Sequence, residues 1–197
     1  GAFWEFGSPD WERTELFLLF GVAEDHDSNP IKIGLGKLKD RGIRTISVNP
    51  VQTGYSAVAD DWVGITPGTD GLLIMSLIHV LMKTGHIDLD YLMRYTNAPW
   101  LVIRNPGQSD DGLFLRDKDN KPQIIDSKTG RPVAFDKGGI RPQLKGEVKN
   151  KSGLIAVPSF MLMVEEWLDE QYSPEATEAN TGIPAARVYG LAKSIAE

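Results

Sequence analysis

The chain has 197 residues, 41% of them hydrophobic and 24% charged, which is typical of a globular protein with a sizeable core. The formal net charge is -6 and the Lys and Arg residues are scattered along the sequence, which argues against nucleic acid as a partner. The absence of cysteine excludes disulfides, thiolate zinc sites and iron–sulfur ligation within these residues.

Neither a metal site nor a membrane contact is expected from this segment. The three histidines, His26, His79 and His86, lack metal-ligand spacing. The longest apolar run, near residues 72–82, is shorter than the roughly 18 residues of a membrane helix. The first residues have no initiator Met and no signal-peptide features, so they suggest a piece of a longer polypeptide. Any export signal would precede Gly1, which leaves the cell compartment open.

The first part of the chain alternates strand and helix patterns. Residues 16–22 form a continuous apolar run, typical of a strand buried on both faces of a parallel sheet. A polar loop follows, in which Asp27 or Ser28 is a good helix cap, and the apolar spacing predicts a helix that ends before Gly42. The apolar run at 43–48 is expected to lie parallel to the first, because a short helix connects them.

Three helical segments and a short strand complete this part. A turn of helix is predicted at 55–60, a strand at 61–67, a long apolar-faced helix at 70–83 and a short helix from 88 to 95. After residue 98 the sequence becomes rich in Gly, Pro and Lys. Short strand patterns occur there at 101–104, 113–116, 123–126 and 133–135. Helical patterns return at 160–168, at a start signal near Ser173, and from 184 onwards.

These patterns define an α/β fold class. We predict a Rossmann-like, doubly wound and mostly parallel sheet with a β-meander insertion. The predicted domains are an N-terminal lead-in at 1–14, the Rossmann-like domain at 15–97 and 151–197, and the β-rich insertion at 98–150. Ligands of such sheets bind where the strands end, so the expected ligand is a nucleotide.

Two turns at the strand ends are candidate ligand contacts. Asn49 can hydrogen-bond a ribose or base while Pro50 fixes the loop, although turn chemistry explains both residues equally well. In the second turn Gly68 lets a ligand approach the backbone, Thr69 can donate to a phosphate, and the Asp70 carboxylate can accept two N–H groups from a guanine. The alternative for the second turn is an ordinary helix cap.

No function is assigned to the other motifs of the sequence. Gly34-Leu35-Gly36 lies inside a helix and lacks a third glycine, so the fingerprint of a nicotinamide site is absent. The acidic pairs at 60–61 and 110–111 are interpreted as solvated loop charges. No catalytic constellation emerges, and neither catalytic residues nor metal ligands are predicted.

Several stretches together resemble a known family: FGVAEDHDSNPIKIG, GIRTISVNPVQT, a segment with the turn PGTD and later YTN, and a final segment with TGIPA. They resemble the molybdopterin oxidoreductases of the dimethyl sulfoxide reductase superfamily. That family includes formate dehydrogenases, nitrate reductases, and polysulfide, thiosulfate and arsenate reductases. The resemblance covers about residues 15–103 and 155–197.

The resemblance implies a domain that binds one guanine dinucleotide arm of the bis(molybdopterin guanine dinucleotide) cofactor of molybdenum. It places one group of residues along the phosphates: Gly21, Ala23, Asp27, Ser28 and Asn29. It places a second group at the ribose and guanine: Asn49, Pro50, Thr53, Gly68, Thr69 and Asp70. Many family members have Asn where this chain has Ala23, and Asp-Pro-Arg where it has Asn49-Pro50-Val51.

The implied function is an internal domain of a molybdenum-dependent oxidoreductase that transfers oxygen atoms or electrons on a small substrate, of the formate, nitrate, sulfur or arsenic oxyanion class. The expected partners are the remaining domains of the parent chain and possible electron-transfer subunits, with a 4Fe-4S cluster elsewhere in the parent. The fragment alone is expected to be inactive. A non-catalytic nucleotide-binding α/β module is the alternative that the residues leave open.

Overall fold

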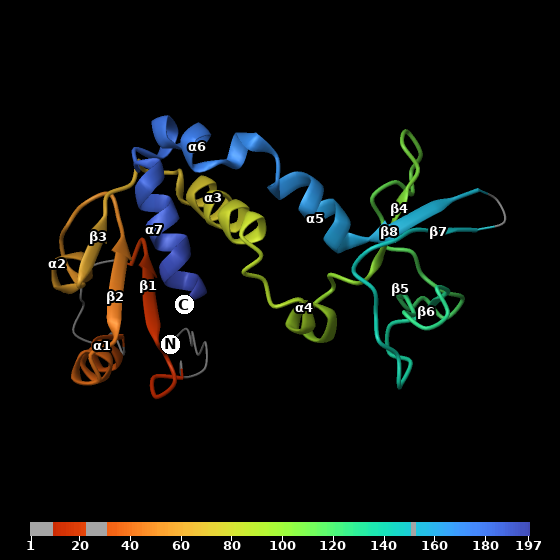
Figure 1. The fold of residues 1–197 in the computed structure, drawn as a ribbon, viewed down its shortest axis with the longest axis horizontal. Coiled ribbons are helices and arrows are strands. Elements are labelled where there is room, and N and C mark those ends of the chain that lie inside the picture. The colour runs from red at the N-terminus through yellow and green to blue at the C-terminus, as the bar shows by residue number, and fades with distance from the viewer. Residues whose placement is uncertain (1–9, 23–30, 151–152) are drawn as a thin grey trace, which may run out of the picture. The chain divides into compact units, whose positions relative to one another are not determined.

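The computed structural model describes residues 10–22, 31–150 and 153–197 (Figure 1). The chain forms two compact units, the first made of Gly1–Leu81 and Glu170–Glu197 and the second of Met82–Asp169. The fold is mixed α/β with small sheets, so the predicted class is confirmed at this level. None of the helices in the described ranges is long and apolar enough to cross a bilayer.

A parallel three-stranded sheet is the centre of the first unit. Its strands are β1 (Leu16–Phe20), β2 (Arg44–Val48) and β3 (Asp61–Val63), in the order β1-β2-β3. Phe20 pairs with Val48, and Val48 pairs with Val63, so all three strands end at the same level. The predicted parallel pairing of the first two strands is confirmed. The third strand is shorter than predicted, because residues 64–67 have left the sheet.

Helices pack against both faces of this sheet (Figure 1). On one face the side chain of Leu19 packs with helices α1 (Ile31–Asp40) and α2 (Tyr55–Val58). On the other face Ile46 and Val48 pack with α3 (Asp70–Lys83) and α7 (Ala185–Ala196). The helices contribute buried apolar side chains to these two cores: Leu35, Leu38 and Tyr55 to the first, and Leu73, Leu77, Val80, Val188 and Leu191 to the second.

Strand β2 is buried on both faces but carries polar side chains on one of them. Thr45 and Ser47 are 0% and 2% exposed. Burying a hydroxyl is costly unless it finds a partner. Here Thr45 Oγ1 donates to Asp60 Oδ2 at 2.8 Å, and the hydroxyls of Ser47 and Ser56 lie 2.7 Å apart. These bonds fix α2 and the chain before β3 against the sheet.

The first glycine of the Gly34-Leu35-Gly36 stretch in α1 has a packing role. A Cβ atom on Gly34 would lie 2.3 Å from the Trp11 ring, so only glycine lets that indole approach the helix. The same ring lies 5.4 Å from Phe17 of β1, centroid to centroid. Gly34 thus faces an aromatic side chain of the chain itself, as expected for a packing glycine and not for a pyrophosphate-binding turn.

The C-terminal part of the first unit has well-defined helix ends. The segment contains a 3-10 turn η1 (Glu170–Tyr172) and helix α6 (Pro174–Thr181) before α7. Ser173 Oγ accepts from Ala176 N, so the predicted helix start at this serine is confirmed. Helix α6 ends at Gly182 in the left-handed conformation with φ 72°, and Glu178 Oε2 accepts from Ala185 N at the start of α7.

The second unit contains short helices and two small antiparallel sheets. Helix α4 (Leu89–Tyr95) begins at Asp88, whose carboxylate accepts from Tyr91 N at 2.8 Å. Strands β4 (Leu101–Arg104), β8 (Ile155–Pro158) and β7 (Val148–Lys149) form one sheet in that order, and β5 (Gln123–Ile125) pairs with β6 (Pro132–Ala134). Helix α5 (Ser159–Trp167) follows β8 directly.

Strands β4, β5 and β6 of this region were predicted, and there are three differences. The predicted strand at 113–116 is wrong: Phe114 bridges to Val102 and Arg116 to Pro122, so the segment divides its pairing between two neighbours. Strand β7 was not predicted, and neither was strand β8. Strand β8 pairs with both β4 and β7, so this sheet joins residues on both sides of position 150. The division into 15–97 with 151–197 and 98–150 stays a prediction.

A carboxylate between two arginines ties α7 to the sheet. Asp61 Oδ2 lies 3.0 Å from Arg44 Nη2, and Asp61 Oδ1 accepts from Arg187 Nη2. Arg44 Nη1 also donates to Ser194 Oγ of α7 at 3.0 Å. The Asp61 side chain is 20% exposed, so water screens these pairs less than pairs on the open surface.

We predict that Asp61→Asn lowers the free energy of unfolding by about 1 kcal/mol, since it removes a partly buried charge shared by two guanidinium groups. Urea unfolding of the wild type and the variant measures this loss. Asp10→Asn is the matched control, because Asp10 and Arg13 form an exposed pair at 3.6 Å. A loss no larger than that of the control would contradict the role of Asp61.

Candidate cofactor-binding edge

The turns after β1 and β2 lie side by side at one edge of the sheet. Gly21 N donates to Val48 O at 3.0 Å, and Asn49 N donates to Val63 O at 3.1 Å. Gly21 has φ 56°, and a Cβ atom there would meet nothing within 4 Å, so its backbone is open to a ligand. The structure therefore brings together the first two predicted turns.

The turn at Asn49 is a closed local structure. Its side-chain Oδ1 accepts from Val51 N at 3.3 Å, which is the turn chemistry considered as the alternative in the sequence. Its backbone carbonyl accepts from Trp62 Nε1 at 2.9 Å. The Trp62 ring also covers Gly64, where a Cβ atom would lie 3.0 Å from the indole. Pro50 is exposed beside this turn.

The turn before α3 presents a carboxylate at the start of the helix. Thr69 Oγ1 donates to Thr66 O at 2.8 Å, so this hydroxyl closes the turn. Gly68 has φ 83° with open space at its Cβ position. Asp70 begins the helix and is partly buried, and among the described residues none donates a hydrogen bond to its carboxylate. That carboxylate is therefore free to accept from a ligand.

Helix α3 places this turn at the same edge as the others. Its Leu73 and Leu77 pack against the face of the sheet that carries Ile46 and Val48. The chain leaves β3 at Val63, the strand end that is level with Phe20 and Val48, and reaches Asp70 after seven residues. The third predicted turn thus follows the same end of the sheet.

A segment distant in sequence supports the turn before α3. Thr66 N donates to Thr181 O at 2.9 Å. A Cβ atom on Gly182 would lie 3.3 Å from Thr66 Oγ1, so a glycine suits this close approach as well as its positive φ. Spacing arguments missed both this contact and Trp62. The signals that could have revealed them are the Gly after a helix end and the spacing of Trp62 and Gly64, two residues apart.

The remaining predicted site residues are Thr53, which forms no hydrogen bond with the described residues of the other turns, and four residues that the structure does not describe. Thr53 is exposed and lies two residues before α2, where its carbonyl accepts from Ser56 N at 3.0 Å. Four predicted phosphate contacts lie outside the described residues: Ala23, Asp27, Ser28 and Asn29. The described edge therefore comprises Gly21, Asn49, Pro50 and the turn from Gly68 to Asp70, with Thr53 near it in sequence.

The donors and acceptors present suit the nucleotide part of a cofactor. Two glycines leave the backbone open, Asn49 offers an amide, and Asp70 offers an acceptor-only carboxylate for paired N–H groups. Nothing here suits a metal ion directly, because the described ranges contain no cluster of three or more His, Cys, Asp or Glu side chains. The groups at this edge therefore suit the binding of a nucleotide.

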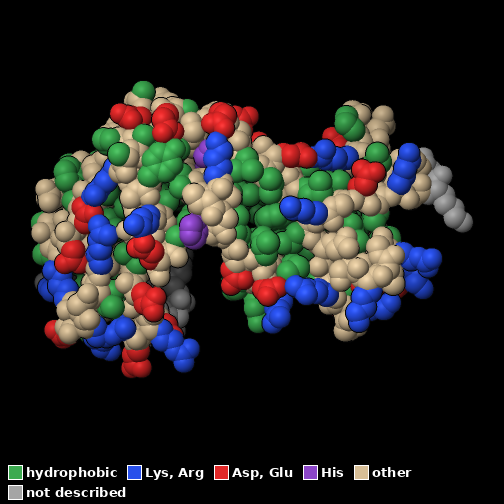
Figure 2. All heavy atoms as spheres, in the orientation of Figure 1, with side chains coloured by type: hydrophobic (Ala, Val, Ile, Leu, Met, Phe, Trp, Pro, Cys, Tyr) green, Lys and Arg blue, Asp and Glu red, His purple; other side chains and the backbone are tan. Residues whose placement is uncertain are grey.

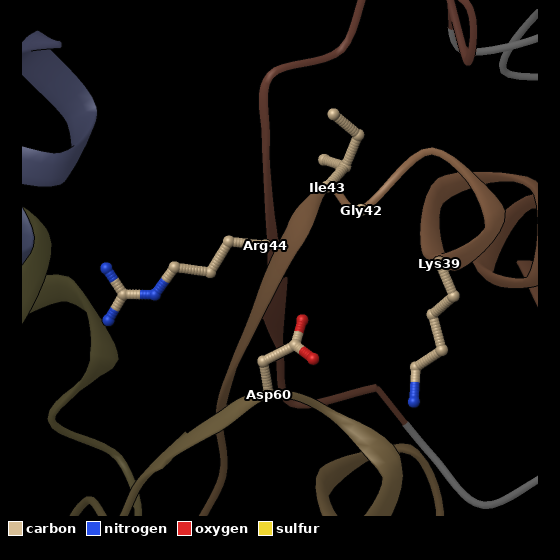
Figure 3. A pocket seen from close by; sticks show the side chains of 5 residues that line it. All are labelled: Lys39, Gly42, Ile43, Arg44 and Asp60. Atoms are coloured by element: carbon tan, nitrogen blue, oxygen red, sulfur yellow. The ribbon is translucent and has the colours of Figure 1, made fainter.

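A pocket of about 380 Å³ lies at the opposite end of the strands (Figure 3). It is lined by Lys39, Gly42, Ile43, Arg44 and Asp60. Figure 3 shows the side chains of Lys39 and Asp60 facing the pocket, while Arg44 points away from it. Lys39 Nζ donates to Val58 O at 2.5 Å. The backbone N–H and the hydroxyl of Thr45 both donate to Asp60, and these bonds lower the pKa of its carboxyl.

The chain was compared with known proteins. No protein-family model matches it. It is 45% identical over 201 residues to a subunit of the sulfite dehydrogenase of Allochromatium vinosum, covering 98% of the chain and 21% of that protein. It is 31% identical over 206 residues to the alpha subunit of the chlorate reductase of Ideonella dechloratans, covering 95% and 22%. The chain thus spans about a fifth of the length of these relatives.

A solved structure has a similar fold. Acetylene hydratase from Pelobacter acetylenicus superimposes with a TM-score of 0.54 at 15% identity, over 92% of this chain and 16% of that one. The relatives are large oxidoreductase subunits, and the chain corresponds to a segment of one such polypeptide. It belongs to the molybdopterin oxidoreductases, which confirms the resemblance seen in the sequence.

We predict that Trp62→Phe lowers the free energy of unfolding by about 1 kcal/mol, because it removes the hydrogen bond to the Asn49 carbonyl while keeping an aromatic ring over Gly64. Urea unfolding measures the change. Val51→Ala is the control, since that side chain is 58% exposed. Equal stability of the Trp62 variant and the control would show that this bond does not hold the turn.

Asp60 predicts a pH dependence of stability. Its folded pKa lies below the ordinary value of 3.8, so the stability from its bonds to Thr45 is present above that value and is lost as the pH falls through the folded pKa. Compared with Asp60→Asn, the wild type should be more stable at neutral pH, and the difference should shrink below about pH 4. Unfolding free energies measured from neutral to acid pH test this; a constant difference would contradict it.

Proposed function

We propose that the sheet edge described above binds one guanine dinucleotide arm of a molybdopterin cofactor. The turn at Gly21 would lie along the phosphates, the turn at Asn49 beside the ribose, and Asp70 at the guanine. The predicted residues Ala23, Asp27, Ser28, Asn29, Pro50, Thr53, Gly68 and Thr69 belong to the same proposed site.

One observation carries this proposal: a carboxylate without a donor among the described residues, at a strand-end edge where two other turns meet. Guanine presents two adjacent N–H donors, and a carboxylate accepts both at once. Such charge-assisted bonds are stronger than neutral ones. The open backbone at Gly21 and Gly68 supports the approach of a bulky ligand.

We also propose that the three parallel strands are part of a larger, Rossmann-like and doubly wound sheet. The helices on both faces support this arrangement, because a parallel sheet needs cover on both sides. The alternation of strand and helix in the first unit supports it too. In such a sheet, ligands bind beyond the carboxyl ends of the strands, which is the edge that carries Asp70.

The parent protein is proposed to be a molybdenum-dependent oxidoreductase that acts on a small oxyanion by oxygen-atom or electron transfer. The names of the relatives support this substrate class, since they refer to sulfite, chlorate, perchlorate and nitrate. When bound, the metal–pterin cofactor would supply the redox chemistry, while the residues of this chain bind and orient its nucleotide end. A non-catalytic nucleotide-binding module is not favoured, because the relatives are oxidoreductases.

The proposed partners are the other domains of the parent chain and further subunits. The names of the relatives describe each of them as one subunit or as an alpha chain, which supports an assembly of several polypeptides. Electron-transfer subunits and a 4Fe-4S cluster outside these residues belong to this proposal.

We predict that Asp70→Asn in the full protein reduces its content of bound cofactor. Loss of a charge-assisted acceptor weakens binding by about 1.5–3 kcal/mol, or roughly 10- to 150-fold. The amount of GMP released from purified protein by acid hydrolysis, per mole of protein, measures the nucleotide, and the fluorescence of the oxidised pterin measures the other half of the cofactor.

The matched control is Asp40→Asn, which changes an exposed carboxylate at the C-terminal end of α1. It should keep wild-type GMP and pterin contents. Unchanged GMP in the Asp70 variant, with pterin present in both proteins, would contradict the assignment of Asp70 to guanine. Absence of both from the wild type would contradict the proposed cofactor itself.

A further inference from the structure

Residues 98–150, which lie within the second unit, carry an excess of positive charge although the whole chain is acidic. Residues 98–150 contain ten Lys and Arg against seven Asp and Glu, whereas the whole chain has a net charge of -6. Between residues 127 and 146 there are five Lys and Arg and one acid, Asp136. That acid lies 2.5 Å from Lys121 Nζ, a contact that raises the lysine pKa. Asp136 is therefore paired with a lysine outside this stretch and does not neutralise the five cations between residues 127 and 146.

Four of these cations lie on or beside the β5–β6 hairpin: Lys128 and Arg131 at its turn, Arg141 next to that turn, and Lys137 after β6, beyond the opposite end of the pairing. Asp126 N donates to Arg131 O at 3.0 Å, and the neighbouring Ser127 N donates to Arg141 O at 3.0 Å, so these arginines come from adjacent backbone segments. The charges of Lys128 and Lys137 both lower the pKa of the Asp126 carboxyl, after the larger effects of its own hydrogen bonds. We call the exposed side chains Lys128, Arg131, Lys137 and Arg141 the basic hairpin surface.

The acid at the centre of this surface is turned inward. Asp126 is 5% exposed. Its Oδ1 accepts from Lys128 N at 3.0 Å and its Oδ2 from Thr129 Oγ1 at 2.8 Å. These bonds fix the turn and occupy the carboxylate, so Asp126 presents little negative charge to the solvent.

Among the described residues, one further acidic side chain forms an ion pair with this surface. Arg141 faces Asp90 at 3.6 Å, with both side chains more than 60% exposed, and such pairs are weak. Figure 2 shows Lys and Arg side chains clustered over the region where Figure 1 places β5 and β6. The surface therefore projects an unbalanced positive field into solvent.

An exposed aromatic side chain lies on the same hairpin, two residues before Lys137. Phe135 is 44% exposed, and its ring centroid lies 5.2 Å from that of Trp100. Its backbone N–H donates to Pro122 O at 2.9 Å, so the residue is fixed from two sides. A rigid, half-exposed aromatic beside charged residues is the usual composition of a protein–protein interface, with an aromatic centre and a charged rim.

We propose that the basic hairpin surface, with Phe135, docks an acidic surface of a different polypeptide of the parent assembly. This inference rests on the proposed function for the existence of that polypeptide. Charge complementarity identifies the partner's chemistry: a cluster of Asp and Glu beside an apolar spot. Nucleic acid is the less suitable occupant, because the chain as a whole carries a charge of -6 and would repel a polyanion.

Carbodiimide cross-linking of the native assembly tests this inference, because it joins amines to carboxylates that are already paired. Mass spectrometry should find Lys128 and Lys137 linked to Asp or Glu residues of a different polypeptide. Links to the parent chain itself or to a second copy of it would overturn the proposal. So would acetylation of both lysines at equal rates in the assembly and in the isolated parent chain.

A charge-reversal variant gives an independent readout. Lys128→Glu, Arg131→Glu and Lys137→Glu together should weaken binding of the cross-linked partner by roughly tenfold or more at low salt, and less at high salt. Arg13→Glu, Lys37→Glu and Lys193→Glu change three exposed cations of the first unit by the same total charge, and should weaken it less than about twofold.

Equal weakening by the two triple variants would overturn the proposal. Cofactor content separates this test from the function above. The basic-surface variant should keep the wild-type amounts of GMP and pterin. Loss of the partner with normal cofactor supports the docking surface, whereas a wild-type protein without cofactor contradicts the proposed function and leaves the cross-links as a separate result.

Discussion

The level ending of three parallel strands is the constraint on which the first unit depends. Because Phe20, Val48 and Val63 are paired in register, the chain must leave the sheet three times at one edge. Helices on both faces bury the strands and hold that register, since a slip of one residue would exchange the apolar and polar sides of β2. The edge and its turns follow from this pairing.

The turns are then fixed by contacts that leave part of the edge open. Trp62 closes the turn at Asn49, and the segment around Thr181 supports the turn before α3. Neither contact uses the Asp70 carboxylate or fills the space beside Gly21 and Gly68. A rigid edge with a few available polar groups is what a nucleotide site requires, because ligand affinity falls when loops must be ordered on binding.

Local patterns predicted much of the fold. The apolar runs identified β1 and β2, the spacing of leucines identified α3, and capping residues identified the starts of α4 and α6. The failures concern pairing between distant segments. Nothing local to residues 113–116 says that Phe114 and Arg116 pair with different neighbours, and nothing in residues 155–158 shows that they complete a sheet begun at Leu101.

The turns of the candidate site could be predicted from the sequence, but the contacts that support them could not. Glycine and Asp at strand ends indicated the turns at Gly21 and Asp70, while the resemblance to molybdopterin oxidoreductases indicated the ligand. The support from Trp62 and Gly182 could not be predicted, because it depends on side-chain geometry and on a contact between residues 66 and 181. The basic hairpin surface was also missed, since scattered Lys and Arg in the sequence converge only when the hairpin forms.

A structure of the full protein with its cofactor, at a resolution that shows hydrogen bonds to the guanine, is the most direct test of the central claim. The account predicts that the paired guanine N–H groups contact the Asp70 carboxylate and that the dinucleotide lies across the turns at Gly21 and Asn49. A guanine bound elsewhere, for instance in the pocket between Lys39 and Asp60 at the opposite end of the strands, would contradict it.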